Sequence, residues 1–135
     1  SATGVRDTAI EMLTRHPEEQ SLLRKYSFDE LTSKSVYECA LKGDSIANQI
    51  FEFTGQILGE SLANFVMFSS PARIVLFGGL TKSGNLILNP TRKHMEQNLL
   101  PIFQNKVKII FSELHESDAA ILGASALVWE MVKSA

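Results

Sequence analysis

Two short runs of apolar residues constrain the fold most strongly: RIVLF at residues 73–77 and VKIIF at residues 107–111. The first run shows no alternation of apolar and polar residues, which is typical of a parallel strand that is covered on both faces. The second run predicts another strand. Between them, NPTRKHMEQNLL predicts a helix that Asn89 caps and Pro90 begins, with Pro101 marking its end. This order of elements predicts a right-handed βαβ unit with a parallel sheet.

A last helix is expected after the second strand. Ser117 or Asp118 would open it, and it would continue to about residue 132. The chain then contains only two predicted strands, whereas an independent sheet usually needs three or more. A sheet of two strands would be too small to bury the apolar faces of all the predicted helices. We therefore expect the chain to be part of a larger protein or to pair with a second copy of itself.

The first half of the chain predicts helices only. SFDE at residues 27–30 and SVYE at residues 35–38 both fit the capping box S-x-x-E, so a short helix is expected to start at each. Gly43 is suited to end the second helix, because glycine tolerates a left-handed backbone. The chain is thus expected to be a single piece with a helical region, residues 1–70, and a βαβα unit, residues 71–135.

Asp44 is expected to cap a long helix over residues 45–68, whose apolar positions form a wide stripe. A stripe of this width predicts a mostly buried helix. Gly55 and Gly59 lie four residues apart on one face of it. Because glycine inside a helix costs about 1 kcal/mol relative to alanine, we expect another backbone to approach closely there. Helix packing is favoured over a ligand role.

The composition sets limits but indicates no activity. The chain of 135 residues has a net charge of −2 and no basic run, which argues against nucleic-acid binding through a basic patch. Its single cysteine, Cys39, excludes an internal disulfide and suits a reducing compartment. The apolar stretches are too short or too interrupted to span a bilayer. These features predict a cytoplasmic protein.

Gly78 and Gly79 follow the first predicted strand at its carboxyl end, which is the edge where open α/β sheets bind ligands. Glycine allows the backbone to approach a flat base or a phosphate, and the N-terminus of a following helix favours an anion. The sequence here matches neither G-x-G-x-x-G nor G-x-x-x-x-G-K-[ST]. From these residues alone, a nucleotide site and a plain tight turn both stay open.

The histidines predict neither a metal site nor a catalytic group. His16, His94 and His115 are far apart and lack the spacing of zinc ligands. His94 is expected to face solvent on a charged helix. His115 lies among acidic residues in a loop, where a solvated cluster is favoured over acid–base chemistry. No catalytic residue and no metal ligand is therefore assigned within the chain.

Several segments together resemble the ROK family of repressors, open reading frames and sugar kinases. The family pattern is Gly-Asp, a helix with Leu-Gly and Leu-Ala-Asn, a proline, and a hydrophobic strand ending in Gly-Gly, followed later by a closing helix with Gly-Ala. The matching positions are Gly43-Asp44, Leu58-Gly59, Leu62-Ala63-Asn64, Pro71, residues 74–79 and Gly123-Ala124. The order and spacing of these pieces carry the resemblance, which covers essentially the whole chain.

The resemblance implies a fold and an activity. It implies an α/β fold of the actin-like, ribonuclease-H-like ATPase group, mostly helical with a short parallel βαβ unit. It also implies a glucokinase-like enzyme that transfers the γ-phosphoryl group of ATP to a hexose hydroxyl with Mg²⁺. Gly78 and Gly79, with Leu80 and Thr81 beside them, would lie against the adenosine part of the nucleotide. The family often has a third glycine where this chain has Leu80.

The resemblance further implies what the chain lacks. The phosphate-binding loop, the general-base aspartate and the structural zinc ligands of the family are expected upstream, so the chain would be the C-terminal part of a kinase and inactive alone. The matching part of a ROK transcriptional repressor and a dimerisation module without catalysis are the alternatives. A homo-oligomer is expected, with a hexose substrate in the parent protein, no membrane partner, and no nucleic-acid partner unless the repressor alternative holds.

Overall fold

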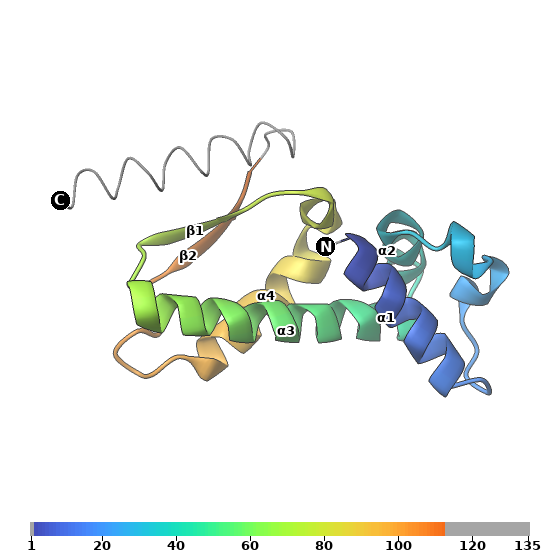
Figure 1. The fold of residues 1–135 in the computed structure, drawn as a ribbon, viewed down its shortest axis with the longest axis horizontal. Coiled ribbons are helices and arrows are strands. Elements are labelled where there is room, and N and C mark those ends of the chain that lie inside the picture. Colours follow the sequence, from blue (N-terminus) through green and yellow to red (C-terminus); the bar gives the residue numbers. More distant parts are fainter. Residues whose placement is uncertain (1, 113–135) are drawn as a thin grey trace.

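The computed structural model describes residues 2–112, whose fold is shown in Figure 1. The expected last helix and His115 lie outside these residues. The elements in chain order are α1 (Ala2–Arg15), η1 (Leu22–Lys25), η2 (Phe28–Glu30), α2 (Ser33–Leu41), α3 (Ser45–Ser69), β1 (Arg73–Leu76), η3 (Gly79–Ser83), α4 (Asn85–Asn98) and β2 (Lys108–Phe111). Here α denotes an α-helix, η a 3-10 helix and β a strand. Within the described part, no helix is long and apolar enough to cross a membrane.

The second half of the described chain forms two layers, with the sheet over α3 and α4 (Figure 1). β1 and β2 pair in parallel, and Ile74 lies opposite Ile109. Both isoleucines are buried in a core to which the two helices contribute Ala63, Val66, Met95 and Leu99. The predicted parallel arrangement of strand, helix and strand is therefore confirmed for β1, α4 and β2.

Glycines of α3 allow α4 to approach closely. A β-carbon added at Gly55 would lie 2.6 Å from Cβ of Pro90. One added at Gly59 would lie 2.6 Å from the carbonyl oxygen of Thr91 and 2.7 Å from the backbone nitrogen of Met95. These separations are too short for real β-carbons, so any side chain there would push the helices apart. The expected close approach of a second backbone is confirmed.

The first half of the described chain is helical, as expected, and packs around the N-terminal half of α3. The core between α1, η1, α2 and α3 includes Val5, Leu23, Val36, Ile46 and Ile50. The stability of this region comes from the burial of apolar side chains, because each short helix would be only marginally stable by itself. α3 thus belongs to two cores, one at each end.

Asp44 caps α3, as predicted, and also connects it to η1. Its Oδ1 accepts a hydrogen bond from the backbone N–H of Ala47 at 2.9 Å, and its Oδ2 accepts one from Leu22 at 2.5 Å. The hydroxyl of Ser21 donates to the same carboxylate at 3.0 Å. Gly43 precedes this cap with φ +84°, which confirms the left-handed position predicted for it.

The start of α2 differs from the prediction. The N-cap is Thr32 rather than Ser35, and the helix begins at Ser33. Thr32 and Ser35 satisfy each other: the N–H of Thr32 donates to Ser35 Oγ at 2.9 Å, and the N–H of Ser35 donates to Thr32 Oγ1 at 3.1 Å. This reciprocal pair satisfies two backbone donors and so favours the earlier start. The SFDE segment makes its expected bond, from Ser27 N–H to Glu30 at 3.1 Å, but forms only the single turn η2.

The prediction that Pro90 begins a helix is wrong, because α4 begins more than one turn earlier, at Asn85. Gly84 precedes the helix with φ +53°, a conformation that glycine adopts without strain. Proline inside a helix normally loses a hydrogen bond and creates a steric conflict. Here its ring lies against Gly55, where α3 has no side chain. The packing of α3 on α4 therefore accommodates the proline.

α3 is also less buried than its wide apolar stripe predicts, since Phe53, Ile57, Phe65 and Phe68 are all exposed. Its N-terminal half buries one side against α1 and α2, and its C-terminal half buries the opposite side against α4. In the sequence, these two separate stripes add up to a single wide one. A count of apolar positions therefore overestimates how much of the helix is covered.

Candidate functional site

The glycine turn after β1 is shaped by Gly78. This residue has φ +107° and ψ 178°, a conformation that is open essentially to glycine alone. The next residues form η3, in which the backbone N–H and the hydroxyl of Thr81 both donate to the carbonyl oxygen of Gly78, at 3.1 and 2.7 Å. Gly78 and Thr81 therefore hold the turn in one conformation.

A pocket of about 420 Å³ lies between this turn and α2. Its lining residues come from α2 on one side and from η3 on the other: Ser33, Lys34, Tyr37, Glu38, Gly79, Lys82 and Ser83. The volume lies within the range of small-molecule sites in proteins, about 300–1,000 Å³. The pocket opens beyond the carboxyl end of β1, where α/β proteins bind ligands.

Gly79 is the residue of the predicted set that lines the pocket. Its backbone is not in the left-handed region, and a β-carbon added there would meet no atom within 4 Å. Neither backbone conformation nor packing within the described chain therefore requires glycine at this position. The missing side chain has one visible consequence, which is to leave room in the pocket.

The side chains of Leu80 and Thr81 make contacts away from the pocket. Leu80 packs against the N-terminal core, and the hydroxyl of Thr81 is bonded within the turn. Neither residue lines the pocket. A direct contact of these two residues with a nucleotide stays a prediction, and their visible contribution is to position the turn.

Four pocket residues that the sequence analysis missed have groups available for a ligand. The charged side chains of Lys34, Glu38 and Lys82 are exposed, and none of them forms an ion pair within residues 2–112. Tyr37 is half-buried and packs against the N-terminal core, which limits the movement of its ring. The pocket thus offers an aromatic ring, two ammonium groups and a carboxylate.

Ser83 adds a further hydrogen-bonding group to this pocket. The residue is only 4% exposed, and it lines the pocket. Together with the open space at Gly79, Ser83 makes this pocket a candidate site for a small molecule.

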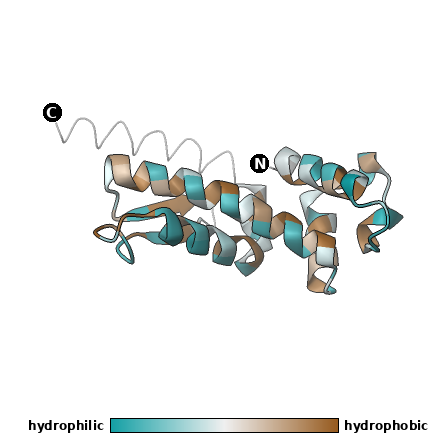
Figure 2. Cartoon of the chain, turned by 90° about the horizontal axis from the view of Figure 1, so that it is seen from below, coloured by the Kyte–Doolittle hydropathy of each residue, from teal (hydrophilic) through white to brown (hydrophobic). Residues whose placement is uncertain are grey.

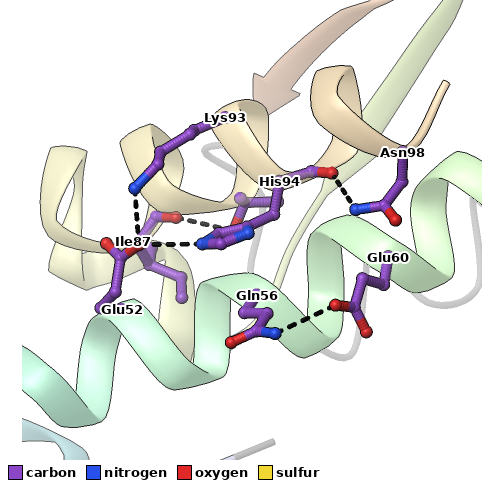
Figure 3. A network of polar contacts seen from close by, with 8 residues as sticks. Glu52, Gln56, Glu60, Ile87, Lys93, His94 and Asn98 are labelled. Atoms are coloured by element: carbon purple, nitrogen blue, oxygen red, sulfur yellow. Dashed lines mark hydrogen bonds and ion pairs between the residues drawn. The ribbon is translucent and has the colours of Figure 1, made fainter.

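A second polar cluster connects α3 to α4 (Figure 3). Glu52 Oε1 accepts hydrogen bonds from Lys93 Nζ at 3.0 Å and from His94 Nε2 at 2.8 Å. The bond from His94, followed by that from Lys93, holds the pKa of Glu52 below its ordinary value. The His94 side chain is only 15% exposed, so the expectation that it faces solvent is wrong. Sequence periodicity missed this pairing because it does not show where α3 lies.

The geometry of the Glu52 cluster favours a structural role. Its carboxylate is shared by Lys93 and His94, and both contacts join α3 to α4 (Figure 3). Across residues 2–112, no group of three or more His, Cys, Asp or Glu side chains could hold a metal ion. Among the described residues, the pocket at Gly79 is therefore the stronger candidate site.

The fold of this chain is part of the actin-like fold, as its solved structural neighbours show. A solved structure from Cytophaga hutchinsonii, provisionally described as a sugar kinase, superimposes on this chain with a TM-score of 0.80 and 26% identity. The match covers 95% of this chain and 42% of that structure. The glycine turn and its pocket thus belong to a fold found among kinases.

The chain belongs to the ROK family, whose family profile matches residues 3–131. It is 31% identical over 134 residues to a glucokinase of Halalkalibacterium halodurans, which covers 99% of this chain and 40% of the glucokinase. It is 29% identical over 126 residues to the DNA-binding transcriptional dual regulator NagC of Escherichia coli, which covers 93% of this chain and 30% of the regulator. The chain thus spans less than half the length of these relatives.

Proposed function

We propose that the chain is the nucleotide-side part of an ATP-dependent sugar kinase of the glucokinase type. The pocket between α2 and η3 carries this proposal, because Gly79 leaves it open beyond the carboxyl end of β1. The similarity to a glucokinase over nearly the whole chain supports it. In this proposal, the chain binds and positions the nucleotide.

The lining residues fit the parts of a nucleotide. The ring of Tyr37 would pack against the base, and Ser83 would donate or accept a hydrogen bond within the buried part of the pocket. Glu38 would accept hydrogen bonds from ribose hydroxyls. Lys34 and Lys82 would attract the phosphates, since ammonium groups act as point charges for them. ATP bound in this way would supply the γ-phosphoryl group for transfer to a hexose.

Phosphoryl transfer depends mainly on positioning and on neutralising charge around the phosphates. We propose that the hexose, Mg²⁺ and a structural zinc are bound by other parts of the intact kinase, because this chain spans 40% of its glucokinase relative. The chain alone is accordingly expected to be inactive as a kinase. A cytoplasmic location goes with the proposal, since its one cysteine, Cys39, is free and buried.

A ROK transcriptional repressor is the second candidate. The similarity to NagC, at 29% identity, is nearly as high as the similarity to the glucokinase, at 31%. The two candidates differ in what the intact protein does with its ligands. A kinase phosphorylates a hexose with ATP, whereas a repressor changes its DNA affinity when a sugar binds. An assay of ATP-dependent sugar phosphorylation by the intact protein discriminates between them.

Substitution of Gly79 tests the pocket itself. A valine at Gly79 would fill space in the pocket without striking the protein, because a β-carbon there has no neighbour within 4 Å. In the intact kinase, Gly79→Val is expected to raise the KM for ATP about tenfold or more, which is the effect of roughly 1.4 kcal/mol of overpacking on a ligand. The KM for the sugar should change less than about twofold, and the melting temperature should stay the same.

The matched control is Gln97→Val, which places the same side chain on the exposed side of α4, away from the pocket. It should leave both KM values unchanged. Equal increases of both KM values in Gly79→Val, or an unchanged KM for ATP, would contradict the assignment of the pocket. Absence of ATP-dependent phosphorylation by the folded intact protein would instead favour the repressor.

A further inference from the structure

A second groove, of about 480 Å³, lies between the N-terminal halves of α3 and α4. Its volume is within the range of small-molecule sites, about 300–1,000 Å³. We call it the amide groove, because asparagine and glutamine side chains form much of its lining. The lining residues are Ser45, Asn48, Gln49, Phe51 and Glu52 from α3, and Asn85, Leu86, Asn89 and Pro90 from α4.

The polar residues of the groove come from one face of each helix. Those of α3 lie three or four residues apart, as neighbours on one side of a helix do. Figure 2 shows that hydrophilic residues recur along α3 between hydrophobic ones. Asn85 and Asn89 are four residues apart on α4 and are both exposed. Two polar helix faces therefore border the same hollow.

Asn89 is a residue that local structure does not account for. The sequence predicted it as a helix cap, but α4 begins at Asn85 and its N-cap is Gly84. Asn89 thus stands inside the helix, where asparagine is less favourable than alanine because its side chain competes for backbone hydrogen bonds. It is exposed, so core packing does not require it either. Its carboxamide is left as part of the lining of the groove.

Two carboxamides on the α3 side are held in place by the protein itself. Asn48 Nδ2 donates hydrogen bonds to the carbonyl oxygens of Ala40 at 3.2 Å and Asp44 at 2.9 Å. Gln49 Nε2 donates to Ser45 Oγ at 3.0 Å. Because these bonds use amide hydrogens, the oxygens of both carboxamides keep their role as acceptors. Groups that are ordered in advance lose less conformational freedom when a ligand binds.

The charge of the groove restricts the ligand. Glu52 alone is charged among the lining residues, and its Oε1 is shared by Lys93 at 3.0 Å and His94 at 2.8 Å (Figure 3). An anionic ligand would lie beside this carboxylate without a cationic group in the lining to bind it. An apolar ligand would take the carboxamides out of water without giving them hydrogen bonds. Both classes are therefore disfavoured.

Hydroxyl groups match this lining. A hydroxyl both donates and accepts a hydrogen bond, and a carboxamide offers donors and an acceptor. Phe51, only 1% exposed, and the half-buried Leu86 add apolar surface that can contact the carbon atoms of a ligand. A compound with several hydroxyls on a short carbon skeleton meets both requirements.

We propose that the amide groove binds a small neutral polyhydroxyl compound, a sugar or a sugar alcohol. Its hydroxyls exchange hydrogen bonds with Asn85 and Asn89 on the α4 side and with Asn48 and Gln49 on the α3 side. This inference rests on the lining of the groove. It depends neither on the pocket at Gly79 nor on the proposed kinase activity.

Titration of the intact protein with sorbitol tests the site. The protein is isotope-labelled at asparagine, and the side-chain amide signals of Asn85 are followed by NMR after assignment through their loss in Asn85→Ala. They should shift and saturate with a dissociation constant of about 1 mM. Asn89→Ala should weaken binding at least about fivefold, as loss of a hydrogen-bonding side chain does. Alanine favours a helix, so circular dichroism should show an unchanged fold.

The matched control is Asn64→Ala, which makes the same change at an exposed asparagine of α3 outside the groove and should leave the affinity unchanged. Two related compounds test the ligand class. Gluconate replaces one terminal hydroxymethyl group of sorbitol by a carboxylate, and hexanediol with a hydroxyl at each end lacks the inner hydroxyls. Each should bind at least about tenfold more weakly than sorbitol.

Absence of a shift with sorbitol up to about 100 mM would overturn the proposal. So would an unchanged affinity in Asn89→Ala, because the shift at Asn85 would then arise from binding elsewhere. Equal affinities for sorbitol and gluconate, or for sorbitol and hexanediol, would contradict the recognition of neutral hydroxyl groups. The titration contains no nucleotide, so its outcome is separate from that of the kinase assay.

Discussion

The contact between α3 and α4 allows the effect of one methyl group to be calculated. Alanine at Gly59 would place its β-carbon 2.6 Å from the carbonyl oxygen of Thr91, 2.7 Å from the nitrogen of Met95 and 2.8 Å from Cβ of His94. Ordinary contact begins at 3.4 Å, so α4 would have to move by about 0.8 Å. Two of the three neighbours are backbone atoms, which cannot rotate away as a side chain can.

Overpacking of this kind costs about 1–3 kcal/mol and occasionally more, and two backbone contacts place Gly59→Ala at the upper end. The higher helix propensity of alanine offsets about 1 kcal/mol of this cost. We therefore expect the free energy of unfolding to fall by about 2 kcal/mol, which lowers the melting temperature by roughly 5–10 °C. Differential scanning calorimetry and urea unfolding measure both quantities.

The control is Ser61→Ala, which replaces an exposed residue on the opposite side of the same helix. Its free energy of unfolding should stay within about 0.5 kcal/mol of the original. If Gly59→Ala were as stable as the unmodified protein, or gained the roughly 1 kcal/mol of propensity, the close approach of α4 would not exist in solution.

Two further predictions concern polar contacts in the described chain. Arg24 donates hydrogen bonds to three backbone carbonyls at the end of α1 and in the following turn, so Arg24→Ala should lower the free energy of unfolding by about 1–2 kcal/mol. The control Lys25→Ala, at an exposed neighbour, should change it by less than about 0.5 kcal/mol. Equal effects of the two substitutions in urea unfolding would show that the Arg24 contacts do not stabilise the fold. Because the pKa of Glu52 is lowered in the folded state, its contribution is present above the ordinary glutamate pKa of about 4.3 and is lost as the pH falls through the lowered value. The difference in melting temperature between the unmodified protein and Glu52→Gln should therefore shrink below about pH 4, and a constant difference from pH 7 to pH 3 would contradict this sign.

The candidate site was only partly predictable from the sequence. Gly78 and Gly79 stand out because two glycines after an apolar run mark a turn at the end of a strand. Lys34 and Glu38 lie four residues apart, on one face of α2, but nothing in their spacing shows that this face meets the turn. Ser83 is an ordinary polar residue in the sequence, and only its burial in the pocket distinguishes it.

Local features were determined by the sequence itself. Asp44 caps α3, Gly43 adopts a left-handed backbone, and the two apolar runs form strands, because hydrogen bonds and backbone sterics act within a few residues. Gly55 and Gly59 also predicted a close contact, because glycine lowers helix stability and a close approach of another backbone can compensate for that cost. These predictions depend on no knowledge of which elements are neighbours.

The tertiary structure decided the features that join distant parts of the chain. It placed Pro90 against Gly55, so that a helix could begin before the proline instead of at it. It also divided the apolar surface of α3 between two cores and an exposed side that carries Phe53, Ile57 and Phe65. The pocket exists only because α2 and the turn at Gly79 pack side by side. Packing pairs residues some forty positions apart, and hydrophobic periodicity identifies an apolar face without identifying what covers it.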